Sequence, residues 1–182
     1  MRLFIACHFS KEAQKEMERM REALRRHAEK GSFTRSENFH LTLAFLGETE
    51  KEKIENIKRC MAQSAGSAFE MKLQNIGRFS QREGNLYWMG VQAPKELYAL
   101  RERLYHSLQS EGFFPDTRPF QPHVPLGRRI RPDIPLKSFN VRPIISQINS
   151  IFLMQSLRVN GILVYKEIWQ TPLNSTEGKE QL

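Results

Sequence analysis

Short apolar runs alternate with charged, amphipathic stretches along the whole chain, and this alternation limits the folds that are open to it. Residues 3–9 form a compact apolar run with β-forming side chains. Ser10 is a good N-cap for a helix over residues 11–30. A buried strand over 39–46 and a second helix over 51–63 follow. The first third of the chain therefore predicts strands and helices in alternation.

The remainder of the chain continues this alternation with more strands. Strands are expected over residues 69–79, 85–91, 123–130, 147–158 and 162–169. The first two flank a polar turn and the last two flank Asn160-Gly161, so each pair predicts a hairpin. Pro94 opens a third helix, which ends at Gly112.

No flexible linker divides these elements, and 182 residues fit one domain of ordinary size. Sequential strands with helices between them predict an α+β fold with mostly antiparallel sheets and helices on their outer faces. We expect a single domain over residues 1–174 and a polar C-terminal tail over 175–182. Each half contains a helix, an irregular segment with aromatic residues, and then a strand that begins with histidine, which is a weak internal repeat.

The chain carries a formal net charge of +8, which favours an anionic partner such as nucleic acid, an anionic membrane or an acidic protein. Cys7 and Cys60 have no metal-ligand spacing, and two cysteines are too few for a disulfide scaffold. No apolar stretch is long enough for a signal sequence or a membrane span. We therefore expect a cytoplasmic monomer with reduced cysteines, no membrane association, no metal and no cofactor.

The first histidine at a strand start lies in His40-Leu41-Thr42-Leu43. His40 and Thr42 are two residues apart, so they share one face of the strand at a separation of about 7 Å. Leu41 and Leu43 point to the other face and anchor the strand in the core. A rigid element thus holds an imidazole, which can move a proton, beside a hydroxyl, which can donate a hydrogen bond to a phosphate oxygen.

The second such element is His123-Val124-Pro125-Leu126. It again starts with histidine and has apolar residues at its second and fourth positions. Its third residue is Pro125, which supplies neither a hydroxyl nor a backbone N–H. Proline within a strand also indicates an edge position or a bulge.

Together these elements resemble the 2H phosphoesterases, and within them the bacterial and archaeal RNA 2',3'-cyclic phosphodiesterases, also called 2'-5' RNA ligases. That family is defined by two His-x-Thr-x motifs. Residues 40–43 match the motif fully, and residues 123–126 match it except at Pro125. Further segments that are similar to the family are 2–6, 37–48, 77–79, 87–88, 118–123 and 163–165.

The resemblance implies a bilobal fold in which two antiparallel sheets face each other across a central groove, related by a pseudo-twofold axis. It also implies metal-independent hydrolysis of RNA 2',3'-cyclic phosphate ends to 2'-phosphomonoesters. By this analogy, His40 donates a proton to the leaving 3' oxygen and His123 accepts a proton from water. Thr42 is the first candidate to stabilise the phosphoryl oxygens.

Pro125 leaves the second phosphate donor missing, and one such donor commonly contributes about 2.7–4 kcal/mol of transition-state stabilisation. We expect reduced activity unless Arg128 replaces it, since the family often has a basic residue there; Arg129 is the other possibility. The odd offset of Arg128 from His123 puts it on the wrong face of a regular strand, which a bulge at Gly127 would correct. Surface charge that steers RNA is the alternative for both arginines.

Aromatic side chains beside the groove are candidates to stack a base, and these are Phe79, Tyr87 and Phe120. The alternative for each is a place in the core. Other functions also stay open at this point. The same site could join a cyclic phosphate to a 5' hydroxyl as an RNA ligase. An RNA-binding protein that has lost catalysis is favoured by the altered second motif and the positive charge, and a purely structural protein is a further alternative.

Overall fold

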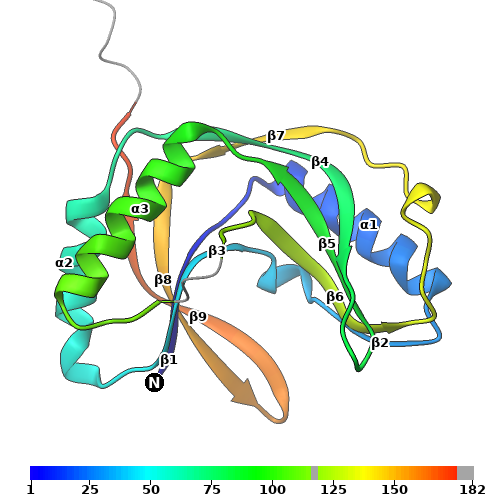
Figure 1. The fold of residues 1–182 in the computed structure, drawn as a ribbon, viewed down its shortest axis with the longest axis horizontal. Helices are drawn as coiled ribbons and strands as arrows, with labels where there is room; N and C mark the ends of the chain where they lie inside the picture. Colours follow the sequence, from blue (N-terminus) through cyan, green and yellow to red (C-terminus); the bar gives the residue numbers. More distant parts are fainter. Residues whose placement is uncertain (116–118, 176–182) are drawn as a thin grey trace, which may run out of the picture.

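The computed structural model describes residues 1–115 and 119–175, which form two antiparallel sheets (Figure 1). The strand order of the four-stranded sheet is β3 (Leu41–Glu48), β1 (Arg2–Cys7), β8 (Ser150–Val159), β9 (Ile162–Pro172). That of the five-stranded sheet is β2 (Lys30–Phe33), β6 (His123–Arg131), β5 (Asn85–Gln92), β4 (Phe69–Phe79), β7 (Ile144–Ile148). Residues 176–182 of the tail predicted over 175–182, and Arg118 of the family-like segment, lie outside the described residues.

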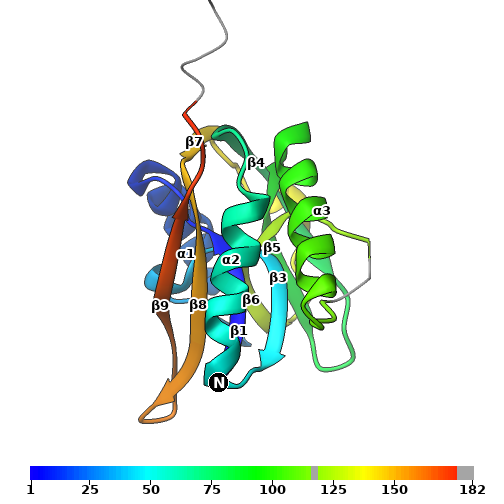
Figure 2. The same cartoon turned by 90° about the vertical axis from the view of Figure 1, so that its left-hand side faces the viewer.

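A helix need not pack on the sheet whose strands it connects in sequence. Helix α1 (Lys11–His27) lies between β1 and β3 in sequence, but it packs on β6 and β7 of the other sheet. Helices α2 (Ile54–Ser64) and α3 (Lys95–Ser110) pack on each other, α2 against β9 and α3 against β3. Figures 1 and 2 show α2 and α3 side by side, with α1 at the opposite end of the molecule. The predicted α+β fold, with antiparallel sheets covered by helices, is confirmed.

Short 3-10 helices complete the fold: η1 (Ser36–Asn38), η2 (Lys51–Lys53) and η3 (Leu136–Ser138). Among the described residues, none of the helices has the length and apolar character needed to cross a membrane.

Helix α1 begins as predicted, but it ends earlier. The Ser10 hydroxyl accepts a hydrogen bond from the Ala13 amide at 3.2 Å, so Ser10 is the N-cap. The helix ends at His27, and residues 30–33, of which Lys30 was expected in the helix, form strand β2. They pair with β6, Phe33 opposite Gly127. The predicted end at residue 30 was wrong because this pairing is a tertiary contact that helical periodicity does not show.

The predicted strand over 147–158 is also wrong, because it is two strands in different sheets. Strand β7 pairs with β4, whereas β8 pairs with β1 and β9. The chain changes sheets at Asn149, whose carbonyl accepts a hydrogen bond from the Leu173 amide at 2.8 Å. Both predicted hairpins are confirmed, β4–β5 and β8–β9. The second turns at Asn160-Gly161 with φ angles of 51° and 78°.

Each sheet has an outer face in the main core and an inner face that carries different side chains. On β1, Leu3 and Ile5 lie in the main core. Phe4 and Ala6 point the other way and form a second cluster with Met154, against which Phe152 and Tyr165 pack. On β6, Val124 and Leu126 lie in the main core, so His123 and Pro125 belong to the inner face. The two inner faces carry the histidines that the sequence singles out.

Candidate active site

His40 is held at the start of β3 by two hydrogen bonds. Its Nδ1 lies 2.7 Å from the carbonyl oxygen of Asn38, and its Nε2 lies 3.1 Å from the Thr42 hydroxyl oxygen. A carbonyl can only accept, so Nδ1 carries the proton and Nε2 of the neutral ring accepts from Thr42. The Asn38 amide in turn donates to the carbonyl of Leu163 on β9 at 3.0 Å. The unprotonated nitrogen of His40 therefore faces Thr42.

Aromatic rings surround His40 and disfavour its charged form. The Phe4 ring lies 4.8 Å away and the Tyr165 ring 5.0 Å away, the latter edge-on. Burial lowers the pKa of His40 to about 4, although the bond to Asn38 opposes this shift. Positive charge on His8, Arg128 and His123 contributes to this lowering of the pKa. His40 is therefore neutral at pH 7 in the free protein.

His123 is held in the same way at the start of β6. Its Nδ1 lies 2.7 Å from the carbonyl oxygen of Gln121, so Nδ1–H donates and Nε2 of the neutral ring is unprotonated. The rings of Phe79 and Trp88 pack edge-on against it at 5.3 Å and 5.9 Å. Burial lowers the pKa of His123, the Gln121 bond opposes this, and the charge of Arg128 adds to the lowering.

Electrostatic interaction connects the two histidines, although each lies at the start of a strand in a different sheet. His40 interacts electrostatically with His123 and with Arg128, and Arg128 also interacts with His123. Tyr165 of the four-stranded sheet has a pKa raised by burial, and the charge of Arg128 opposes that shift. Arg128 therefore sits where the two inner faces meet, within electrostatic reach of both imidazoles.

A bulge in β6 turns Arg128 toward the histidines. Trp88 of β5 pairs with Pro125, and the next residue, Tyr87, pairs with Gly127, so β6 holds one extra residue there. Leu126 and Gly127 are both buried, as this irregularity requires. The extra residue reverses the alternation of side chains. Arg128 thus lies on the face of His123, and the irregularity lies next to Gly127, where the sequence suggested it.

Arg129 is directed elsewhere. It follows a second irregularity in β6 and has a positive φ of 56°. Its Nε lies 3.0 Å from a carboxylate oxygen of Glu83, in the turn between β4 and β5. The structure places Arg129 beside this carboxylate at the surface, so Arg128 is the arginine that reaches the two-histidine site.

The three aromatic candidates have different positions. Phe79 lies beside His123, as described above. Tyr87 is fully buried in the main core, and its hydroxyl contacts Asp133 and Ile134, so its predicted role in stacking a base was wrong. The Phe120 ring lies against α3, which leaves its predicted stacking role without support. Its contacts there are Tyr98 at 5.9 Å and Arg101 at 4.5 Å.

Trp88 is the aromatic residue of β5 that sequence reasoning missed. It pairs with Pro125 and so lies on the inner face, whereas its neighbour Tyr87 faces the core. Its ring lies over Gly77 of β4, where a Cβ atom would come within 2.1 Å of the indole carbons. A glycine paired with a tryptophan is the sequence signal that could have found it, once the strands were aligned.

Tyr165 and His8 were also missed as parts of this site. Tyr165 packs edge-on against both Phe4 and His40. His8 stacks on Phe152 with ring centroids 4.2 Å apart and planes at 12°. Burial lowers the pKa of His8, and Glu167 opposes that shift. Within residues 1–115 and 119–175, no group of three or more His, Cys, Asp or Glu side chains is placed to hold a metal ion.

Comparison with known proteins places this arrangement in a family. Residues 9–87 match the family model described as LigT like Phosphoesterase. The RNA 2',3'-cyclic phosphodiesterase of Thermotoga maritima is 31% identical over 131 residues, which are 70% of either chain. The one of Geobacillus stearothermophilus is 32% identical over 109 residues, which are 58% of this chain but 35% of that protein.

A solved structure agrees over nearly the whole length. The crystal structure of Escherichia coli LigT complexed with 3'-AMP superimposes with a TM-score of 0.80 at 26% identity. The match covers 94% of this chain and 97% of the LigT chain. The fold, the two histidine elements and the sequence matches agree, and the chain belongs to the LigT-like phosphoesterase family.

Proposed function

We propose that the protein hydrolyses RNA 2',3'-cyclic phosphate ends to 2'-phosphomonoesters. One observation carries the proposal: two electrostatically connected imidazoles are each fixed through Nδ1, and each has its unprotonated nitrogen at Nε2. Opening a cyclic phosphodiester needs a base for water and an acid for the leaving oxygen, which is what such a pair supplies. The names of the relatives, RNA 2',3'-cyclic phosphodiesterases, support the same substrate.

In the proposed reaction, Nε2 of His123 takes a proton from water as the water oxygen attacks phosphorus. The bond between phosphorus and the 3' oxygen breaks, and Nε2–H of His40 protonates that oxygen. The product carries a 2'-phosphate and a 3' hydroxyl. Both histidines then return to their starting states by exchanging protons with solvent, so one water is consumed per turnover.

This reaction needs a proton on His40, although burial keeps its pKa at about 4 in the free protein. The substrate supplies the missing stabilisation, because a bound phosphate anion favours a nearby imidazolium. In the free protein the Thr42 hydroxyl donates to the unprotonated Nε2 of His40. After protonation Nε2 no longer accepts, and the hydroxyl becomes available to a phosphoryl oxygen.

Arg128 supplies the positive charge that the altered second motif lacks. Pro125 lies on the inner face with His123 but offers no donor. The bulge brings a guanidinium to this face instead, within reach of both histidines. A guanidinium has five N–H donors and keeps its charge, so it can bind two phosphoryl oxygens at once.

The test is turnover of a 2',3'-cyclic nucleotide with the product identified as the 2'- or the 3'-phosphate. We expect the 2'-phosphate, and a 3'-phosphate product would reverse the assigned orientation of the leaving group. RNA binding without turnover would mean that catalysis has been lost. Joining of the cyclic end to a 5' hydroxyl RNA, with no hydrolysis, would mean that the site runs as a ligase.

We also propose that the protein acts as a cytoplasmic monomer of one domain. Cys7 and Cys60 are both free and buried, which suits a reducing compartment. Burial raises the pKa of the Cys7 thiol to about 12. Size-exclusion chromatography with light scattering checks the oligomeric state: a mass near 21.3 kDa is expected, and twice that mass would contradict it.

A further inference from the structure

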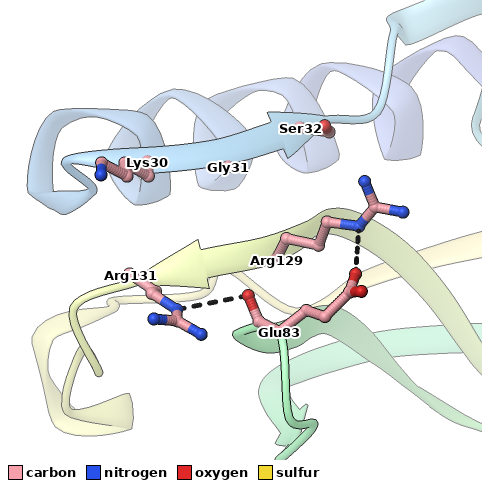
Figure 3. A pocket seen from close by; sticks show the side chains of 6 residues that line it. All are labelled: Lys30, Gly31, Ser32, Glu83, Arg129 and Arg131. Carbon is pink, nitrogen blue, oxygen red and sulfur yellow. Dashed lines mark hydrogen bonds and ion pairs between the residues drawn. The ribbon is translucent and has the colours of Figure 1, made fainter.

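A strongly basic cavity lies at the far end of β6 from His123. It has a volume of about 360 Å³, and Figure 3 shows its six lining residues. These come from β2, from the end of β6 and from the turn between β4 and β5: Lys30, Gly31, Ser32, Glu83, Arg129 and Arg131. Neither histidine of the active site belongs to its lining.

The cavity lies on the same inner face as the active site. Ser32 pairs with Arg128, and Lys30 pairs with Arg131, so each pair of side chains shares a face. Ile130, between the cavity arginines, points to the main core on the other side. His123 and Arg131 begin and end the same strand, which puts them at most roughly 26 Å apart at 3.3 Å per residue. One face of the sheet thus runs from the active site through Arg128 to the cavity.

The charges in the cavity favour an anion. Lys30, Arg129 and Arg131 carry positive charge, and Glu83 is the single carboxylate of the lining, an excess of two positive charges. The Arg131 guanidinium is held in place by the carbonyls of Glu83 and Arg82, at 3.2 Å and 3.0 Å. These bonds fix the guanidinium and use two of its five N–H donors. Arg129 pairs with the Glu83 carboxylate, which an incoming anion would have to compete against.

We propose that this cavity binds a backbone phosphate of the RNA, several nucleotides away from the reacting end. The inference rests on the proposed function, because a 2',3'-cyclic phosphate closes the 3' end of its RNA. Every other nucleotide then lies on the 5' side and leaves the active site in one direction. The basic face that leads from His123 past Arg128 to Lys30 and Arg131 offers a path for the RNA strand on that side. The substrate class is therefore an oligoribonucleotide rather than a cyclic mononucleotide.

The first test compares kcat/KM for a cyclic mononucleotide and for a length series of oligoribonucleotides that end in a cyclic phosphate. We expect kcat/KM to rise with length and to level off once the RNA reaches the cavity. The Lys30→Glu variant should raise KM for the long oligonucleotides by about tenfold or more, the scale of one lost charged contact. It should leave kcat for the oligonucleotides unchanged, and it should leave kcat/KM for the mononucleotide unchanged. Lys15→Glu, at an exposed lysine of α1 on the far side of the sheet, is the matched control and should change none of these values.

The second test measures binding of a labelled oligonucleotide that ends in a 2'-phosphate, which needs no turnover. Lys30→Ala should weaken binding and make the slope of log Kd against log salt shallower by about 0.7, as expected for one lost phosphate contact to a single strand. Glu83→Gln should tighten binding, because it removes the competing carboxylate. If Glu83 and the arginines only hold the turn against β6, Glu83→Gln would leave binding unchanged or weaken it.

The outcomes separate the two proposals. Absence of turnover of both the mononucleotide and the oligonucleotides in the wild type overturns the proposed function, while the binding test still decides the cavity. Wild-type turnover that does not depend on RNA length, together with binding that Lys30→Ala does not weaken, overturns the cavity proposal and leaves the proposed function standing.

Discussion

His40 and His123 make the same hydrogen bond: each ring donates Nδ1–H to the carbonyl oxygen two residues before it, at 2.7 Å. One lies at the start of β3 and the other at the start of β6, in different sheets. The shared bond fixes the tautomer of both rings and puts the unprotonated nitrogen of each at Nε2. Their surroundings differ, because Thr42 contacts His40, whereas the rings of Phe79 and Trp88 pack against His123.

The pH dependence of the proposed activity follows from the surroundings of the two histidines. The proposed reaction needs His40 charged and His123 neutral, and kcat/KM reports the pKa values of the free protein. The pKa of His40 is about 4, and that of His123 lies below its usual 6.5. The charged fraction of His40 multiplied by the neutral fraction of His123 is therefore largest at acidic pH. We expect the kcat/KM optimum there, between about pH 4 and 6.5. The profile of kcat should peak at higher pH, because bound phosphate raises the pKa of His40. A kcat/KM optimum above pH 7.5 would contradict this account.

Arg128 should be essential for turnover of a cyclic mononucleotide. Arg128→Ala removes the guanidinium that lies within reach of both histidines, and we expect kcat to fall by about 10²–10³-fold, the scale of one lost oxyanion donor. Arg26→Ala, an exposed arginine of α1, is the matched control. A fall of less than threefold in Arg128→Ala would mean that the bulge does not serve catalysis.

Pro125 should limit the rate, because it replaces the second hydroxyl of the family motif. Pro125→Thr should raise kcat, and it should compensate in part for Arg128→Ala in the double variant. The measurement is a double-mutant cycle on kcat. Equal effects of Arg128→Ala in both backgrounds would show that residue 125 and the guanidinium act independently.

Gly77 should be required for the position of Trp88 and, through it, of His123. Gly77→Ala puts a methyl group where the indole lies, so we expect lower kcat and a changed Trp88 fluorescence. Trp88→Ala removes the ring, and Gly77→Ala should then have little further effect. Trp169→Phe removes the other tryptophan and isolates the signal. Additive losses in the double variant would separate the role of Gly77 from the indole.

Local sequence signals predicted much of the fold. The Ser10 cap, both hairpins and the strand after His123 followed from hydrogen-bonding side chains, turn residues and apolar alternation. Strand β2 and the change of sheet at Asn149 did not, because both depend on pairing with distant strands. Periodicity within one segment carries no information about which partner it pairs with.

The residues of the candidate site also fall into two groups: those that local spacing predicts and those that only long-range pairing brings together. His40 and Thr42 are adjacent on one strand face, so their contact could be predicted from spacing alone. The choice of Tyr87 instead of Trp88 was a phase error of one residue, since alternation shows two faces without saying which is buried. Tyr165 comes from the last hairpin, and only the assembled sheets bring it to His40.

The most direct measurement is kcat for a 2',3'-cyclic nucleotide in His40→Ala and His123→Ala, with His106→Ala as the control. His106 lies exposed on α3, so its removal should leave kcat unchanged. Each active-site variant should lose about 10²–10⁴-fold, the contribution of one general acid or base. Circular dichroism and thermal unfolding establish that each variant is folded. If either folded variant keeps kcat within threefold of the wild type, the two-histidine mechanism is wrong.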